Sequence, residues 1–280
     1  MESTMIEKHI EIDGINGRKI TIDYRFKEST EFLIPIIYVH GFKGFKDWGS
    51  FNIIANNFAE NGFLYIKFNF SHNGVTIENL IDFSDLEAFG NNNYWIEFRD
   101  LGLVIDWLEQ ADLKIDFSKL SVIGHSRGGG ITLLRAAQDK RIHKAITWAS
   151  VSDFEGRFPK DTSDWKANGV EYIYNGRTEQ MMPLYFQLYE SYYKHQSALD
   201  ILVQCTNIEQ EVLVIHGTND SAVDLKEAKR IVSKVRYSKL EIIENAGHTF
   251  GAVHPAKDKI IHPHLNKVLE LSLKFLAKNR

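Results

Sequence analysis

The first candidate for a catalytic residue is Ser126, which lies between two glycines. The pentapeptide Gly-His-Ser-Arg-Gly at residues 124–128 has the form G-x-S-x-G, with a short apolar run at 120–123 before it and helix-like spacing at 131–138 after it. On such a strand-to-helix turn the serine hydroxyl is exposed above the sheet, and a side chain in place of either glycine would collide with the neighbouring backbone. The pattern predicts that Ser126 is the covalent nucleophile of a hydrolase. An exposed serine in a glycine-rich turn is the structural alternative.

A serine hydroxyl needs a base to remove its proton, and the base needs an acid to orient it. Asp220 lies in the loop after a buried run at 211–215, and His248 follows the last predicted strand, at 239–243. Serine, aspartate and histidine then occur in the order expected for a G-x-S-x-G nucleophile, each after a strand. We therefore predict that Ser126, His248 and Asp220 form a catalytic triad.

Two other aspartates remain as alternatives to Asp220. Asp153 follows a predicted strand at 144–150 and is the first reserve acid. Asp224 is a weaker reserve, because Asp220 lies closer to the end of its strand. An aspartate in such a position also commonly caps a helix, so its position alone would not identify the acid.

Acyl transfer from a serine also requires hydrogen-bond donors for the oxyanion of the transition state. The backbone N–H of Arg127, at the start of the helix after the serine, is one predicted donor. The second is expected in the loop after a buried strand at 32–39, where we assign the backbone N–H of Phe42. His40 and His125 adjoin the site in sequence, and we interpret both as packing and hydrogen-bonding residues.

Alternating strands and helices position these residues. Two stretches of alternating polarity flank Asn16 and Gly17 and predict an antiparallel hairpin, after which strands and helices follow one another to the C-terminus. Asp47 is the predicted cap of the first helix. The sequence thus predicts the α/β class, with a mostly parallel eight-stranded sheet and helices on both faces. The predicted strands are 8–13, 19–26, 32–39, 63–70, 120–124, 144–150, 211–215 and 239–243, and the predicted helices are about 48–60, 94–110, 131–138, 225–235 and 260–277.

One segment interrupts the alternation. Residues 153–199 lie between two sheet strands, where a plain crossover would be much shorter. We interpret 153–200 as a helical, aromatic-rich cap insertion within a single domain, 1–280. A crossover helix with irregular flanks is the alternative. The aromatic residues of this segment are Phe154, Phe158, Trp165, Tyr172, Tyr174, Tyr185, Phe186, Tyr189, Tyr192 and Tyr193.

Charge and composition favour a cytoplasmic enzyme acting on a small molecule. The 280 residues carry a net charge of −4 without a basic block, which argues against a nucleic-acid partner. The first nine residues lack the apolar core of a signal peptide, and no apolar run is long enough to cross a membrane. A single cysteine, Cys205, excludes a disulfide within the chain. A homodimer is compatible with this composition.

No cofactor is predicted. The chain has neither a P-loop nor a dinucleotide fingerprint. His254, His262 and His264 cluster near the C-terminus, and the last two could chelate a metal ion. Because they flank a proline in a polar segment, we interpret them as surface histidines and predict no metal site.

Taken together, the motifs resemble those of the α/β-hydrolase superfamily, over nearly the whole chain. Bacterial serine esterases of the dienelactone-hydrolase, acyl-peptidase and cinnamoyl-esterase types are the most similar. The resemblance implies an α/β-hydrolase fold and, separately from the spacing argument, a triad of Ser126, Asp220 and His248. A serine at residue 126 argues against dehalogenases and epoxide hydrolases, which carry aspartate there, and against dienelactone hydrolases proper, which carry cysteine. The matching segments are 40–44, 124–129, 216–223 and 246–250.

The expected activity is hydrolysis of carboxylic esters through an acyl-enzyme. The aromatic cap insertion favours an aromatic, cinnamoyl-like acyl group, unless its rings only pack the segment onto the body; a short acyl group is the other option. Lys43, Lys46 and Arg127 near the site would favour an anionic group, unless they are merely solvated. Two alternatives remain: a peptidase or amidase of the acyl-peptidase type, whose usual propeller domain this chain lacks, and a non-catalytic ligand-binding protein of the same fold.

Overall fold

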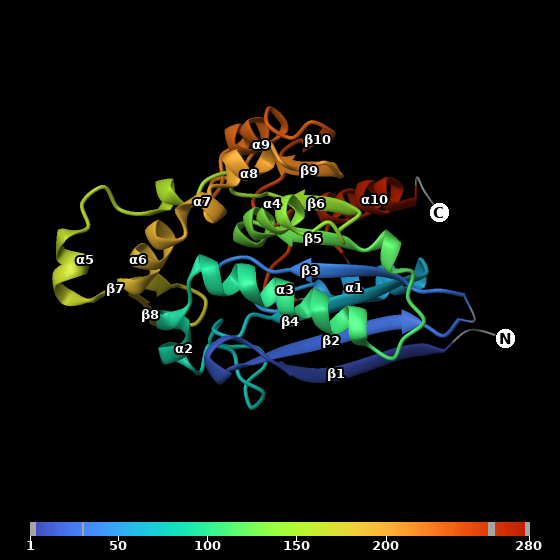
Figure 1. The fold of residues 1–280 in the computed structure, drawn as a ribbon, viewed down its shortest axis with the longest axis horizontal. Helices are drawn as coiled ribbons and strands as arrows, with labels where there is room; N and C mark the ends of the chain where they lie inside the picture. Colours follow the sequence, from blue (N-terminus) through green and yellow to red (C-terminus); the bar gives the residue numbers. More distant parts are fainter. Residues whose placement is uncertain (1–3, 30, 257–260, 278–280) are drawn as a thin grey trace.

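A central eight-stranded sheet organises the computed structural model, which describes residues 4–29, 31–256 and 261–277 (Figure 1). The strand order is β1-β2-β4-β3-β5-β6-β9-β10. β1 pairs antiparallel with β2, β2 pairs antiparallel with β4, and every other pairing is parallel. The predicted mostly parallel sheet and its opening hairpin are confirmed. The strands are β1 Met5–Asp13, β2 Lys19–Lys27, β3 Ile34–Val39, β4 Phe63–Asn69, β5 Ser121–His125, β6 Lys144–Trp148, β9 Glu211–Gly217 and β10 Ser238–Ile243.

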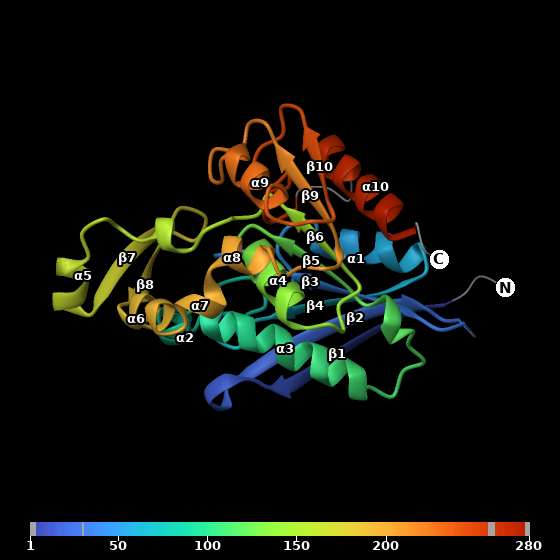
Figure 2. The same ribbon diagram turned by 45° about the horizontal axis from the view of Figure 1, so that its top comes forward.

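Helices cover both faces of the sheet, as predicted (Figure 2). Successive side chains of β3 point to opposite faces: Ile36 and Tyr38 pack with α1 and α10, whereas Ile37 and Val39 pack with α3 and α4. A strand buried on both faces is continuously apolar, which explains why this run was recognisable in the sequence. The helices of the body are α1 Phe51–Glu60, α2 Leu86–Asn91, α3 Tyr94–Gln110, α4 Arg127–Gln138, α9 Leu225–Val232 and α10 Pro263–Ala277.

The predicted cap at Asp47 is wrong. α1 begins at Phe51 and its N-cap position is Ser50. The Asp47 carboxylate instead makes ion pairs with Lys46 and Lys67, both at 2.5 Å. The ion pair with Lys67, which lies on β4, therefore overrides the local helix-start signal.

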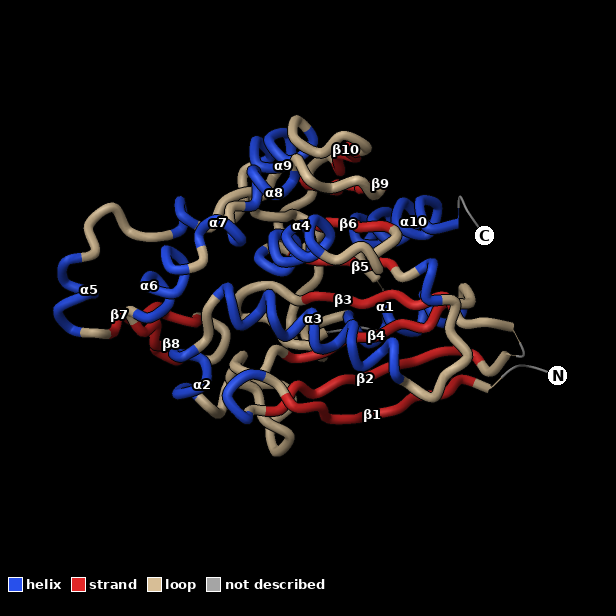
Figure 3. The backbone as a smooth tube through the Cα atoms, viewed as in Figure 1, coloured by secondary structure: helices blue, strands red, loops and turns tan. Residues whose placement is uncertain are grey.

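The segment between β6 and β9 contains the predicted helices and, in addition, a β-hairpin that we did not predict (Figure 3). In β7, Tyr172 and Tyr174 are exposed while Ile173 packs inward, which is the alternation of a half-buried strand. The bounds of the cap insertion, 153–200, and its assignment to a single domain, 1–280, stay predictions. The elements are α5 Ser163–Asn168, β7 Val170–Asn175, β8 Gln180–Tyr185, α6 Gln187–Lys194 and α7 Gln196–Leu199, followed by α8 Ile201–Cys205.

The cap insertion projects from the edge of the sheet at which β3, β5 and β6 end (Figures 1 and 2). This is the edge where sites of open α/β sheets lie. Within the described ranges, no helix has the length and apolarity that crossing a bilayer requires.

Candidate active site

Ser126 lies on a sharp turn between β5 and α4. Its backbone has φ 56° and ψ −120°, a conformation that costs a non-glycine residue on the order of 1–3 kcal/mol. The turn is fixed by its backbone hydrogen bonds. The Ser126 N–H donates to the carbonyl of Trp148 at 2.9 Å, and the Ser126 carbonyl accepts from Gly129, Gly130 and Val151. The strained turn is therefore set by the sheet and the helix on either side of it.

Two glycines of the motif are sterically required. A Cβ on Gly124 would overlap the carbonyl oxygen of Gly128, and a Cβ on Gly128 would overlap the carbonyl oxygens of Val39 and His40. Each overlap is with backbone, which cannot move aside without displacing a strand or a helix. The sequence-based expectation that a side chain at either position would collide with neighbouring backbone is therefore confirmed.

The structure brings the three predicted residues together. His248 Nε2 lies 3.0 Å from Ser126 Oγ, and His248 Nδ1 lies 2.8 Å from Asp220 Oδ2. Burial alone would raise the pKa of Asp220, but hydrogen bonds from His216 and His248 outweigh it and hold that pKa well below its usual range. The ionised carboxylate accepts a hydrogen bond from the Nδ1–H group, so the unprotonated Nε2 can take a proton from the Ser126 hydroxyl.

The two reserve acids lie elsewhere. Asp153 accepts the backbone N–H groups of Glu155 and Gly156. Asp224 is the N-cap of α9 and accepts the N–H of Lys226 at 2.8 Å. Both carboxylates serve local turns, and Asp220 is the aspartate that His248 contacts.

His216, which we did not single out in the sequence, supports Asp220. It is fully buried at the end of β9, and its Nε2 lies 2.8 Å from the carbonyl of Val223 and 3.4 Å from Asp220 Oδ2. The available signal was its position four residues before Asp220, immediately after the apolar strand. It holds the loop that carries the acid.

His40 and His125 pack and hydrogen-bond, as expected. His125 donates from Nε2 to the carbonyl of His248 at 2.9 Å, and burial lowers the pKa of His125 to about 3. His40 donates from Nδ1 to the carbonyl of Gly41, and burial lowers the pKa of His40 to about 4. Both rings are neutral at pH 7. His125 thereby holds the backbone of His248 without adding a charge beside it.

The two predicted oxyanion donors flank Ser126. The loop after β3 passes so closely that a Cβ on Gly41 would lie 3.0 Å from Ser126 Cβ. Arg127 is the first residue of α4, where N–H groups have no partner within the helix. Among the described residues, neither Phe42 nor Arg127 donates its backbone N–H to another group. Both N–H groups are available to a ligand at Ser126.

A buried ion cluster anchors the loop that carries Phe42. Lys46 Nζ lies 2.7 Å from Asp23 and 2.5 Å from Asp47, and Lys67 Nζ lies 2.6 Å and 2.5 Å from the same two carboxylates. Burial opposes ionisation of Asp23, but the two ammonium groups outweigh it and lower its pKa to about 2. The expectation that Lys46 faces a substrate is therefore wrong, because its ammonium group is paired with Asp23 and Asp47 in the interior.

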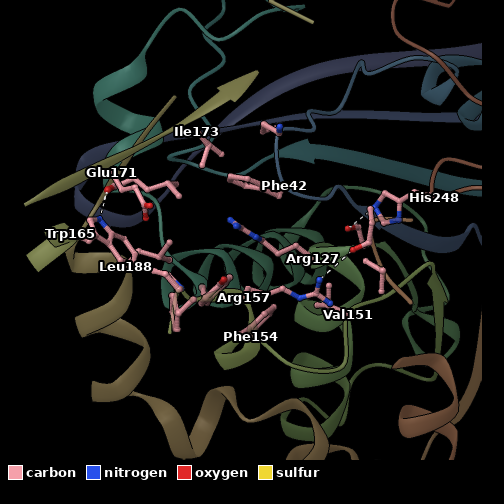
Figure 4. Close-up of a pocket in the computed structure, with 18 residues that line it drawn as sticks. Phe42, Arg127, Val151, Phe154, Arg157, Trp165, Glu171, Ile173, Leu188 and His248 are labelled. Carbon is pink, nitrogen blue, oxygen red and sulfur yellow. Dashed lines mark hydrogen bonds between the residues drawn. The ribbon is translucent and has the colours of Figure 1, made fainter. Parts of the chain in front are cut away.

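A cavity of about 640 Å³ extends from Ser126 toward the cap insertion (Figure 4). Its volume falls in the range of sites that bind drug-sized molecules. Three of the aromatic residues noted in the cap insertion, Phe154, Phe158 and Trp165, line it. The others pack against neighbouring rings, are exposed like Tyr172, or, like Tyr185, hydrogen-bond to the body. The apolar lining comprises Phe42, Tyr94, Val151, Phe154, Phe158, Trp165, Ile173, Leu184 and Leu188.

The arginines of this large cavity are already paired. Arg127 lies 3.3 Å from the buried Glu97, and its guanidinium carbon stacks 4.0 Å from the centre of the Phe42 ring. Arg157 makes an ion pair with Glu227. The large cavity is therefore mainly apolar, and its arginines carry charges that neighbouring carboxylates balance.

A smaller cavity, of about 240 Å³, adjoins Ser126 on another side. The two cavities share Phe42, Lys43, Ser126 and His248. The smaller one is also lined by Asn175 and Arg177 from the turn of the β7–β8 hairpin, and by Gly41, Gly44, Trp48, Phe51, His125 and Thr249.

The described residues hold no group of three or more histidine, cysteine or acidic side chains arranged to bind a metal ion. His254 accepts the N–H of Gly49 at 2.8 Å and packs against Trp48. His262 and His264 contact each other with ring centres 4.8 Å apart.

Comparison with known proteins gives a family and a fold. The sequence model of the prolyl oligopeptidase family matches residues 85–267, more than half of the chain and the part that contains Ser126, Asp220 and His248. No curated protein matches the chain in sequence.

Solved structures with this arrangement share little sequence. Est1E from Butyrivibrio proteoclasticus, solved with ferulic acid bound, is 18% identical with a TM-score of 0.73, covering 95% of this chain and 97% of Est1E. The alpha/beta hydrolase GrgF from Penicillium sp. sh18 is 17% identical with a TM-score of 0.73, covering 97% and 98%. The acylaminoacyl peptidase of Pyrococcus horikoshii is 17% identical with a TM-score of 0.67, covering 98% of this chain but 42% of the peptidase. At these identities the similarity establishes the shared α/β-hydrolase fold.

Proposed function

The chain belongs to the prolyl oligopeptidase family and has the α/β-hydrolase fold, and from this premise we propose that it is a serine hydrolase that cleaves carboxylic esters. The observation that carries the proposal is the hydrogen-bonded series Ser126–His248–Asp220, with distances of 3.0 and 2.8 Å, beside two cavities. A serine, a base and an orienting acid in contact are the minimum that acyl transfer through a serine requires.

In the first half of the reaction His248 Nε2 takes the Ser126 proton while Ser126 Oγ bonds to the ester carbonyl carbon. The carbonyl oxygen becomes an anion held by the backbone N–H groups of Phe42 and Arg127, and each such donor contributes about 3 kcal/mol in known cases. The C–O bond to the alcohol then breaks, and His248 gives its proton to the departing oxygen. Asp220 stays ionised throughout and stabilises the imidazolium.

In the second half a water molecule replaces the alcohol. His248 removes a proton from the water, its oxygen bonds to the acyl carbon, and the acid is released as the proton returns to Ser126. The cycle needs no redox partner, because hydrolysis changes no oxidation state, and every proton that His248 removes is passed to the alcohol or back to Ser126.

The large cavity supports an aromatic or short acyl group. Phe154 and Trp165 from the cap insertion and Tyr94 from α3 surround a space large enough for a phenyl-bearing acid. Est1E, which has a similar fold, has been solved with ferulic acid bound, and this supports the same acyl class.

A second candidate is hydrolysis of an amide or peptide bond. The family match and the likeness to the acylaminoacyl peptidase favour it. A third, ligand binding without catalysis, has the hydrogen-bonded Ser126–His248 pair against it.

Matched substrates separate these candidates. We expect the wild-type protein to hydrolyse 4-nitrophenyl acetate, butyrate and cinnamate, whereas Ser126→Ala retains only the background rate. An aminoacyl 4-nitroanilide cleaved faster than every ester would make the protein an amidase. Two results together would establish a non-catalytic ligand-binding protein instead. The wild type would show no turnover above Ser126→Ala on any substrate, and a fluorophosphonate would fail to label the folded wild-type protein.

Three features stay predictions from the sequence. They are a cytoplasmic location, the lack of a nucleic-acid or membrane partner, and the oligomeric state, for which a homodimer is one option. Fractionation of the source cells tests the first, and light scattering of the purified protein tests the last.

A further inference from the structure

The smaller cavity beside Ser126 differs from the large one in charge. Lys43 and Arg177 line it together with the amide of Asn175, and none of its lining residues, all of them described, is an aspartate or a glutamate. Lys43 also lines the large cavity, but the arginines there are paired with Glu97 and Glu227. The smaller cavity is therefore the cationic side of the site.

Lys43 is the less compensated of the two cations. It is half-buried, its burial lowers the pKa of its ammonium group, and it makes no ion pair with any carboxylate in the described part of the chain. Its Nζ lies 5.9 Å from the centre of the Phe42 ring. An anion in the cavity would supply the electrostatic partner that the protein does not.

Arg177 is only loosely held by the protein. Its Nη1 donates to the carbonyl of Ile81 at 3.4 Å, and its guanidinium stacks 5.5 and 5.7 Å from the ring centres of Phe45 and Phe83. Asp82 is its acidic partner, but the Nη2–Oδ1 distance of 3.6 Å exceeds a hydrogen bond. Among described groups Nη2 has no hydrogen-bond acceptor. The edge of N–H donors with which a guanidinium binds a carboxylate is thus partly unused.

Asn175 adds a third unused donor. Its side chain is 5% exposed, and its Oδ1 accepts the backbone N–H of Arg177 at 3.4 Å, which leaves Nδ2 as the free end of the amide. Nδ2 has no partner among the described residues. A buried donor without an acceptor costs about 1–3 kcal/mol, so a ligand oxygen at this position would be favoured.

The reaction geometry decides which half of the ester this cavity receives. His248 must pass its proton to the departing oxygen, so the alcohol lies on the His248 side of Ser126. His248 lines both cavities, but its hydrogen-bond partner His125 and its neighbour Thr249 line only the smaller one, whereas the large one continues into the apolar cap insertion. At about 240 Å³ the smaller cavity is below the size of sites for drug-sized ligands and fits a compact alcohol.

We propose that the smaller cavity binds a leaving group that carries a carboxylate, so that the preferred substrates are esters of hydroxy acids. Lys43, Arg177 and Asn175 bind the carboxylate, and the acyl group occupies the large cavity. This inference rests on the proposed ester hydrolysis and names the class of alcohol that the reaction releases.

Two esters with one acyl group test it: 3-(butyryloxy)benzoate and its neutral isostere 3-(butyryloxy)benzamide. For each ester, kcat/KM is divided by the rate constant of its uncatalysed hydrolysis. The quantity compared between variants is the ratio of this normalised value for the carboxylate ester to that for the amide ester. We expect a ratio of about ten in the wild type at low salt, falling at 0.5 M NaCl because salt screens the attraction. In Arg177→Gln the ratio falls toward one, and in Arg177→Lys it is intermediate.

Arg236→Gln is the matched control, because Arg236 is an exposed arginine that lines neither cavity. Its ratio should equal that of the wild type. A wild-type ratio of one or below, or a ratio that Arg177→Gln leaves unchanged, overturns the inference.

A binding measurement separates this inference from the proposed function. In calorimetry the Ser126→Ala protein should bind the carboxylate ester about tenfold more tightly than the amide, and the added substitution Arg177→Gln should abolish the difference. If the wild type cleaves neither these two esters nor the 4-nitrophenyl esters, ester hydrolysis is refuted, and the calorimetry still tests whether the smaller cavity binds a carboxylate. Equal affinities for the two esters overturn the inference.

Discussion

The edge of the sheet and the cap insertion build one site by different means. At the sheet edge, Ser126, Asp220 and His248 each follow a strand of the sheet, and backbone hydrogen bonds such as that from Ser126 to Trp148 hold the turn at the nucleophile. In the cap insertion, the β7–β8 pairing aside, side-chain contacts hold the elements together. Trp165 packs edge-on to Phe186 with ring centres 5.4 Å apart. Catalysis thus depends on backbone geometry that tolerates few substitutions. Choice of substrate depends on side-chain packing, which single substitutions can alter in small steps.

The largest contrast is expected at Asp220. Asp220→Asn should lower kcat on an accepted ester by about 10⁴-fold, because an amide does not fix the reactive tautomer of His248 or stabilise its cation. Asp224→Asn is the matched control, since this cap residue lies four positions further on and asparagine caps helices equally well. A comparable loss in Asp224→Asn, or a loss below tenfold in Asp220→Asn, would contradict the assignment of the acid.

A second contrast compares two glycines. Gly128→Ala places a Cβ against the carbonyls of Val39 and His40, and we expect it to lower the free energy of unfolding by about 2–4 kcal/mol. At Gly176, in the hairpin of the cap insertion, the nearest atom to an added Cβ is 3.6 Å away on Tyr174. Gly176→Ala should change stability by less than about 0.5 kcal/mol. Urea denaturation measures both, and equal costs would remove the distinction between the two regions.

The smallest effect is expected in the cap insertion itself. Trp165 is 4% exposed, lines the large cavity and donates from Nε1 to the carbonyl of Leu184 at 2.7 Å. Trp165→Ala should lower kcat/KM for 4-nitrophenyl cinnamate about tenfold relative to the acetate, through the loss of an aromatic contact. Tyr172→Ala, an aromatic of the same segment that is 54% exposed and outside the cavity, should leave this preference unchanged. A preference that Trp165→Ala does not alter would assign the acyl group to another surface.

The same division decides what the sequence could predict. Ser126 and Asp220 follow buried strands, which a continuous apolar run marks locally, whereas His248 follows the partly exposed β10. All three were found because each comes after a strand that the sequence marks. The two glycines of the motif were predictable as well, because the turn itself leaves no room for a Cβ at either position. Residues whose roles follow from their own strand are therefore predictable from sequence.

Roles that depend on distant partners were not predictable. Asp47 follows the local rule for a helix cap, yet Lys67 on β4 and its neighbour Lys46 bind its carboxylate. Arg177 and Asn175 reach the site only because the β7–β8 hairpin folds over it. The hairpin itself left a signal, alternation across 170–175 followed by Asn-Gly, but Pro183 and the many aromatic residues around it masked the second strand.

The place at which the cap insertion leaves the sheet has a consequence for how such proteins diverge. It departs after β6 and returns, through α8, to β9, and these two strands are hydrogen-bonded neighbours. The hairpin that brings Asn175 and Arg177 to Ser126 lies within this single stretch of chain. One insertion, deletion or recombination event between β6 and β9 would exchange much of the lining of the large cavity, and Asn175 and Arg177 of the smaller one, while the codons for Ser126, Asp220 and His248 stay untouched. Descendants of one ancestral gene could thereby acquire new substrates in a single step, without passing through an inactive intermediate.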